Sequence, residues 1–177
     1  ALLEGQRYAE ATQQLQLLTN QNPDFADAWL VQGSLQVQEN QLSAAEASLQ
    51  RFITLAEPLP AGEGRTRGLS SAYMALSQVA ENRKDYPAAS AWLQKIDNAE
   101  ELMAVQGRRA SLMAKQGKLT EGRALLQALP ERTAAEARLK LSAEVQLLRD
   151  NKQFQTAYDL MAKAVADHPF DADLLYD

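Results

Sequence analysis

Few side chains in this chain could carry out chemistry. The sequence has one histidine and no cysteine. His168 stands before Pro169 in a turn, and a lone histidine cannot supply a Ser-His-Asp or Cys-His arrangement or a multi-histidine metal site. Without cysteine there is no disulfide, thiolate zinc site or cysteine nucleophile. The stretch GEGRTRG at residues 62–68 lacks the Lys-Ser/Thr pair of a phosphate-binding loop. We therefore expect no catalytic residue, cofactor or metal, and a protein that is not an enzyme.

The composition favours helices and gives no sign of a nucleic-acid surface. Alanine and leucine supply 31 and 27 of the 177 residues, against 8 Gly and 6 Pro. β-Branched and aromatic residues are sparse and do not alternate, so we predict no strand. The net charge is −5 and the basic residues are scattered, so we expect no nucleic-acid partner. No run of about 18 apolar residues occurs, so we expect no direct membrane span.

A repeated pattern runs through nearly the whole chain. Residues 6–23 and 152–169 each contain an aromatic residue, an alanine three positions later, an apolar residue at the next turn and a closing proline. These residues are Tyr8, Ala11, Leu15 and Pro23, then Phe154, Ala157, Met161 and Pro169. Three more segments fit the frame: Leu42, Ala45, Leu49, Phe52 and Pro58; Tyr86, Ala89, Leu93 and Ile96; and Leu119, Gly122, Leu126 and Leu129. Such self-similarity indicates a repeat array.

This pattern resembles the tetratricopeptide repeat (TPR) family, most clearly at Trp29, Gly33, Ala45, Leu49 and Pro58. The resemblance implies an all-α superhelical solenoid, in which each repeat of about 34 residues is a hairpin of two antiparallel helices, A and B. We expect one TPR array with about four full repeats and a partial repeat at each end. Its divisions are 1–25 (partial), 26–59, an insertion at 60–69, 70–102, 103–137, 138–171, and 172–177 as the start of a next repeat.

Small and large residues recur at positions that would shape such an array. We expect the small ones to let the two helices of a hairpin approach closely and the large ones to fill the space between hairpins. The small residues are Gly33, Ser77, Ala110, Ala45, Ala89, Gly122 and Ala157. The large ones are Trp29, Tyr73, Leu49, Leu93 and Phe154. Trp29 and Trp92 are therefore interpreted as interface residues, not as ligand-stacking residues.

Helix boundaries follow from the same frame. We predict helices at residues 6–20, 26–38, 43–56, 69–82, 86–96, 100–116, 119–129, 133–149 and 154–166. Asp24 is a candidate N-cap, and Ser43 with Glu46 matches a capping box. The insertion, PLPAGEGRTRG at residues 58–68, is either a surface loop or extra turns on the following helix. Within it, Arg65 and Arg67 are candidates for a specific contact.

The resemblance also implies where a partner would bind. In TPR proteins the inner, concave face of the superhelix is lined by the A helices. Transferred position by position, the partner-binding groove candidates are Leu30, Ser34, Val37, Met74, Gln78, Glu81, Arg108, Ser111, Lys115, Gln146, Arg149 and Tyr176. Family members that hold chaperone C-termini carry Lys and Asn at the fifth and ninth positions, and only Arg108 matches their cationic positions here. We expect an extended peptide or a helix instead.

The function expected from these features is a non-catalytic scaffold or adaptor that binds a protein partner. Two alternatives stay open: a self-association module that builds a homo-oligomer, and a regulatory arm of a larger enzyme. The Ala-, Leu- and Gln-rich units resemble long bacterial TPR proteins, some of them envelope lipoproteins. This favours the periplasm or an outer-membrane association over the cytoplasm. The chain starts without Met inside a repeat, so we expect a piece of a longer protein.

Overall fold

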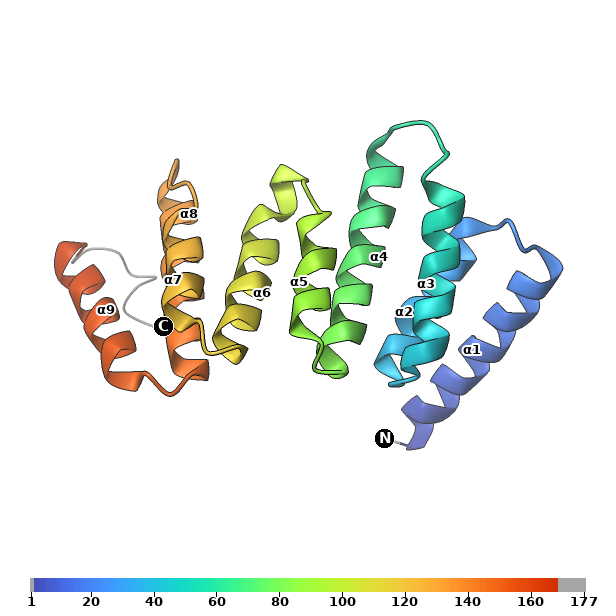
Figure 1. The fold of residues 1–177 in the computed structure, drawn as a ribbon, viewed down its shortest axis with the longest axis horizontal. Helices are drawn as coiled ribbons and strands as arrows, with labels where there is room; N and C mark the ends of the chain where they lie inside the picture. Colours follow the sequence, from blue (N-terminus) through green and yellow to red (C-terminus); the bar gives the residue numbers. More distant parts are fainter. Residues whose placement is uncertain (1, 169–177) are drawn as a thin grey trace. The chain divides into compact units, whose positions relative to one another are not determined.

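The computed structural model describes residues 2–168, and the expected helix start at 172–177, with Tyr176, lies outside them. The described part is all-helical, with nine α-helices and one short 3-10 helix (Figure 1). They are α1 (Leu2–Gln21), α2 (Ala26–Gln38), α3 (Leu42–Ala56), α4 (Glu63–Asn82), α5 (Tyr86–Gln94), η1 (Ala99–Glu101), α6 (Leu102–Lys115), α7 (Leu119–Gln127), α8 (Ala134–Asp150) and α9 (Phe154–Asp167). The predicted helices are confirmed with ends shifted by a few residues. Helices α1 and α4 differ most from the prediction, because they begin at Leu2 and Glu63 and not at residues 6 and 69.

The chain divides into two compact units, Ala1–Ala99 and Glu100–Asp177. The first holds α1–α5 and the second holds α6–α9. Inside each unit, helices that are consecutive in sequence pack against each other, and α2·α4 and α6·α8 are also in contact. This arrangement of sequential hairpins is consistent with a helical repeat array.

Between residues 2 and 168, the same backbone turn closes four hairpins. Asn40, Lys84, Gly117 and Lys152 have φ of 57, 60, 79 and 60°, so successive turns are 44, 33 and 35 residues apart. In each, the next residue's N–H donates to the carbonyl five positions back, at 2.8–2.9 Å. This bond and the left-handed residue together form a Schellman-type helix end. The turns have the same spacings as the starts expected from the sequence for the four full repeats, at residues 26, 70, 103 and 138.

The small residues are buried inside the hairpins, as predicted. All seven are buried. A Cβ atom on Gly33 would lie 2.7 Å from Leu49 Cγ, and one on Gly122 would lie 2.8 Å from the Ala110 carbonyl oxygen. The Ser77 hydroxyl donates to the Ala89 carbonyl at 2.9 Å. The helices therefore touch where the sequence removes side-chain volume, and any larger residue there would push them apart.

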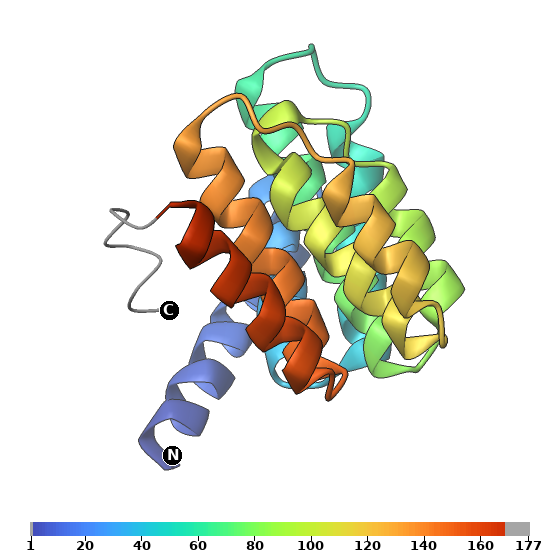
Figure 2. The same ribbon diagram turned by 90° about the vertical axis from the view of Figure 1, so that its left-hand side faces the viewer.

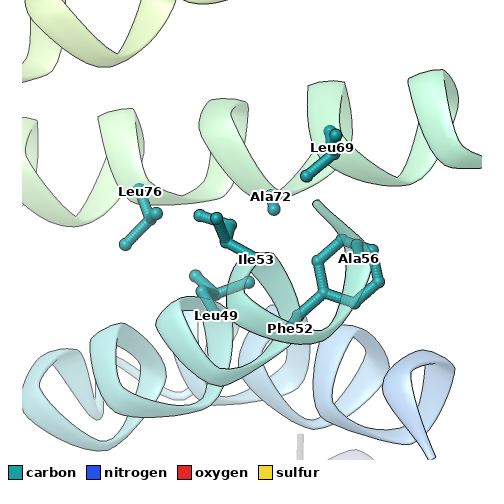
Figure 3. Close-up of a cluster of buried hydrophobic side chains, with 7 residues drawn as sticks. All are labelled: Leu49, Phe52, Ile53, Ala56, Leu69, Ala72 and Leu76. Carbon is teal, nitrogen blue, oxygen red and sulfur yellow. The ribbon is translucent and has the colours of Figure 1, made fainter. Parts of the chain in front are cut away.

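The large residues divide into two groups. Leu49 and Leu93 are fully buried, and Trp29 and Tyr73 are half-buried against the α3–α4 cluster drawn in Figure 3. That cluster consists of Leu49, Phe52, Ile53, Ala56, Leu69, Ala72 and Leu76. The prediction is wrong for Phe154, which is 63% exposed. Helix α9 packs chiefly against α8, and Phe154, in the first turn of α9, stays largely exposed although Ala157, one turn later, is buried.

Both tryptophans lie at helix interfaces, as interpreted from the sequence. The Trp29 indole donates to the Pro23 carbonyl at 2.8 Å. Trp92 stacks on Tyr73 with ring centroids 6.0 Å apart and an interplanar angle of 22°. Burial raises the pKa of the Tyr73 hydroxyl above its ordinary value, with the nearby charge of Glu57 as a further cause.

The predicted caps are wrong because distant arginines bind the same side chains. Phe25, not Asp24, is the N-cap of α2, and the Asp24 carboxylate pairs with Arg51 at 3.2 Å. Helix α3 begins at Leu42, so Ser43 lies inside it. Arg83, the residue that follows α4, donates to both the Glu46 carboxylate and the Ser43 hydroxyl. Ser43 and Glu46 therefore do not form the predicted capping box. They bind Arg83 instead, which links α3 to the C-terminal end of α4.

The insertion is part loop and part helix. Helix α4 starts at Glu63, so residues 57–62 form the loop and the remainder extends α4. Arg65 makes a specific intramolecular contact: its side chain donates to the Ala56 and Glu57 carbonyls at 3.2 and 2.8 Å. These carbonyls lie at the C-terminal end of α3, where helical carbonyls lack intrahelical partners. Arg67 forms only an exposed ion pair with Glu63, one turn away.

A capping box does form at the start of α8, and it makes stability depend on pH. Thr133 Oγ1 accepts from the Glu136 N–H at 3.1 Å, and the Glu136 carboxylate accepts from the Arg132 N–H at 2.7 Å. The side-chain hydrogen bond from Arg132 is the main cause that lowers the pKa of Glu136 below its ordinary 4.5. A lowered folded-state pKa stabilises the fold above the unfolded pKa, and the stabilisation is lost as pH falls through the folded value.

We therefore expect Glu136→Gln to be less stable than wild type at pH 7. The difference should narrow as the pH drops below about 4.5, where the wild-type carboxylate takes up its proton. Urea unfolding of both proteins from pH 7 to pH 3 measures this difference. A difference that stays constant over the whole range would show that the charge of Glu136 is not what holds the cap.

Candidate partner-binding face

The first helices of neighbouring hairpins lie side by side within each unit. In the first unit α2 contacts α4 as well as α3, and in the second unit α6 contacts α8 as well as α7. Equivalent positions on such helices are therefore adjacent, and their side chains form a row across the pair. We call this row the A-helix face.

In the first unit, the six candidate residues on this face are all half-buried. They are Leu30, Ser34 and Val37 of α2, and Met74, Gln78 and Glu81 of α4. Leu30 and Val37 pack against the core cluster, so they offer only part of their surface to a partner. The Ser34 hydroxyl donates to the Leu30 carbonyl at 2.9 Å and keeps acceptor capacity. The row thus combines an apolar base with amide, hydroxyl and carboxylate groups.

In the second unit the face is more polar. Arg108 and Ser111 are half-buried, while Lys115, Gln146 and Arg149 are exposed. The Gln146 amide donates to Asp150 Oδ1 at 2.7 Å, which repeats the Gln78–Asn82 bond of the first unit at the same distance. The last candidate, Tyr176, lies outside the described residues. The structure therefore places six candidates on one unit and five on the other.

One apolar residue of this face was missed. Val31 lies beside Leu30 on α2 and is 49% exposed, which makes it more accessible than any of the six candidates in its unit. Its position in the repeat is that of Arg108, so the same transfer of positions could have found it. Val31 adds an accessible apolar group to the face.

Sequence reasoning also missed a buried polar chain that crosses three helices. The Thr19 hydroxyl lies 3.2 Å from Gln32 Oε1, the Gln32 amide donates to Ser48 Oγ at 3.2 Å, and Ser48 donates to Gln36 Oε1 at 2.7 Å. All four residues are at most 6% exposed. Buried polar groups need hydrogen-bond partners. This series of hydrogen bonds therefore fixes how α1, α2 and α3 align.

The second unit has a charged counterpart at the same repeat position. Glu144 of α8, 6% exposed, corresponds to Gln32 of α2. Glu144 Oε1 accepts from Arg123 Nε at 3.0 Å and from the Gln127 amide at 2.8 Å, both on the preceding helix α7. A polar group at this position thus ties a first helix to the helix before it in both units. This is a structural role, because the groups satisfy one another.

The described residues contain no candidate metal site and no candidate membrane span. Among them, no group of three or more His, Asp or Glu side chains is placed to hold a metal ion. None of the helices between residues 2 and 168 combines the length and apolar character that a membrane crossing requires. Neither a scan against protein-family models nor a search of the curated proteins finds a match to this chain.

Proposed function

We propose that this chain is a TPR-type array that acts as a non-catalytic scaffold and binds a protein partner on its A-helix face. The observation that supports this most is the direct contact of α2 with α4 and of α6 with α8. Within each unit it brings side chains from two successive hairpins into one row. The four identical turns and the buried small residues support the TPR register from which the row was derived.

The chemistry of the row indicates the kind of partner. In the first unit, accessible apolar surface at Val31 and Met74 alternates with the polar groups of Ser34, Gln78 and Glu81. An extended peptide or an amphipathic helix presents the matching combination of apolar side chains and polar groups. The exposed Lys115 and Arg149 in the second unit add affinity for acidic residues of the partner.

Paired charge substitutions test this proposal. Val31→Glu with Met74→Glu places two carboxylates on the A-helix face, and Ala47→Glu with Thr54→Glu places the same charges on exposed positions of α3. Each protein is used as bait in an extract of its native cells, after circular dichroism has shown equal helicity. We expect the α3 variant to capture the same partner as wild type, and the face variant to bind that partner at least about tenfold more weakly. Equal capture by both variants would rule out this face.

A specific observation favours self-association as a second candidate. Helix α9 carries Phe154 and Tyr158, which are 63% and 69% exposed, together with the half-buried Met161 and Val165. These residues line a hollow of about 590 Å³ with Arg149 and two alanines. Apolar surface of this kind marks interaction sites. Sedimentation equilibrium of wild type and Tyr158→Lys would decide: a dimer lost in the variant supports self-association, and a wild-type monomer eliminates it.

A further inference from the structure

A cavity of about 320 Å³ lies inside the α8–α9 hairpin, between the first half of α8 and the last half of α9. The two helices diverge toward these ends in Figure 1, and Figure 2 shows them from the side of α9. Ala137 and Leu141 of α8 and Leu160 and Ala164 of α9 supply its apolar lining. Lys163 also lines it. The volume is at the lower end of the range for small-molecule sites.

The α4–α5 hairpin of the same chain shows what normally occupies this space. Lys84 and Lys152, the left-handed residues of the two hairpins, both have φ of 60° and stand 68 residues apart. The same offset of 68 residues pairs each of five residues that line the cavity with one residue of the α4–α5 hairpin. Leu69, Tyr73, Trp92, Lys95 and Ile96 correspond to Ala137, Leu141, Leu160, Lys163 and Ala164.

In the α4–α5 hairpin, two aromatic rings fill the corresponding volume. Tyr73 and Trp92 stack with centroids 6.0 Å apart, and Lys95 Nζ lies 5.8 and 5.4 Å from their centroids. Leu69 and Ile96, 9% and 8% exposed, close the sides. In the α8–α9 hairpin the rings are replaced by leucines and the flanking residues by alanines. The lysine is retained, but no ring of its own hairpin stands at the equivalent positions.

We propose that the α8–α9 cavity binds an aromatic ring, an indole or a phenol, with the Lys163 ammonium over its face. The apolar part of the cavity's lining is aliphatic and lacks the two rings that the equivalent hairpin contains, which favours a flat apolar group. A lysine above such a ring gains cation–π attraction. The charged residues that line the cavity are two cations, Arg138 and Lys163, and two anions, Glu131 and Asp167, so their formal charges cancel and a neutral ring fits better than an ion.

Ligand titration followed by NMR tests this site. Free indole and N-acetyltryptophanamide are added to the 177-residue protein while the methyl signals of Leu141 and Leu160 are observed. We expect both signals to shift in a saturable way. Tighter binding of the amide would identify the side chain of a partner protein as the source of the ring, and tighter binding of free indole a small molecule. No saturable shift up to the solubility limit of both probes would refute the proposal.

Matched variants locate the ring. Leu141→Tyr with Leu160→Trp transplants the α4–α5 pair, so it should fill the cavity and abolish binding while the melting temperature is kept or raised. Leu160→Phe alone serves the same purpose if the double variant does not fold. Lys163→Met should weaken binding by about threefold. Lys118→Met, an exposed lysine of the same unit, should leave it unchanged. Undiminished binding by both filled variants would overturn the proposal.

A last variant separates a foreign ring from one of the chain's own. Phe170 follows the cavity residue His168 by two positions in the sequence. If the probes bind wild type and Phe170→Ala with equal affinity, the cavity is open to an external ring, as proposed. If they bind only after Phe170→Ala, the chain fills its own cavity and the proposal of an external ligand fails.

Discussion

Gly122→Val should destabilise the protein by about 3 kcal/mol or more, the larger of the two effects expected here. Gly122 of α7 faces Ala110 of α6, and a Cβ at this position would lie 2.8 Å from the Ala110 carbonyl oxygen. That atom belongs to the helix backbone, so it cannot rotate away as a side chain could. The two helices must separate, which opens the packing of Leu126 and Leu129 against Ala110 and Leu147. Urea unfolding monitored by circular dichroism measures the loss.

The matched control is the same substitution at Gly107 of α6. A Cβ there would meet nothing within 4 Å, and the residue lies within the helix. Valine has a somewhat better helix propensity than glycine, so Gly107→Val should stay within about 0.5 kcal/mol of wild type. Equal effects at the two glycines would mean that α6 and α7 do not approach at Gly122.

Arg123→Met should destabilise the protein by about 2–3 kcal/mol, because it leaves the Glu144 carboxylate buried without its cation. The Glu144 side chain is 8% exposed and that of Arg123 31% exposed, with Arg123 Nη2 3.0 Å from Glu144 Oε1. Removing a partner from a buried charge costs more than the pair contributes by itself. Our expected value is below that for a fully buried pair, since Arg123 is partly solvated.

A double variant and an exposed pair complete this test. Arg123→Met with Glu144→Leu removes both charges and should recover most of the loss, to within about 1 kcal/mol of wild type. Arg67→Met breaks the pair with Glu63, whose side chains are 64% and 74% exposed, and should cost at most about 0.5 kcal/mol. Equal losses at Arg123 and Arg67 would contradict the burial of Glu144.

The fold was predictable to the extent that it depends on local, repeated signals. The turns with a left-handed residue recur at the spacing of the repeat, and at one of them the residue is a glycine, Gly117, which the sequence shows directly. Small residues such as Gly33 and Gly122 are conspicuous in a leucine-rich sequence, and they lie where two helices touch. Helix ends followed because turn residues interrupt an otherwise strong helical composition. Each of these features acts over a few residues, which a reading of sequence alone can evaluate.

The errors concern contacts between residues far apart in the chain. Asp24 and Ser43 have the residue types of helix caps, but Arg51 and Arg83, 27 and 40 positions later, bind them instead. Phe154 matches Tyr8 in the repeat frame, but exposure depends on what lies across the helix, which the frame does not specify. The glutamines of the buried polar chain look like ordinary surface residues, because nothing local shows that Thr19 and Ser48 approach them.

The candidate site was accessible to sequence reasoning only as a set of positions. The repeat register identified the helices of the A-helix face, but it did not show that Leu30 and Val37 give part of their surface to the core. The α8–α9 cavity lies where the α4–α5 hairpin carries two aromatic rings and the α8–α9 hairpin carries leucines. It becomes visible only when two hairpins of known geometry are compared.

Site-specific photo-cross-linking shows whether a partner binds on the A-helix face. A photoreactive amino acid replaces Ser34 on that face or, in the control, Thr54 on an exposed part of α3. Both proteins are irradiated in their native cell extract. We expect a specific adduct from position 34, identified by mass spectrometry and absent from position 54. A single adduct shared by both positions, or a specific adduct from position 54 alone, would contradict this expectation.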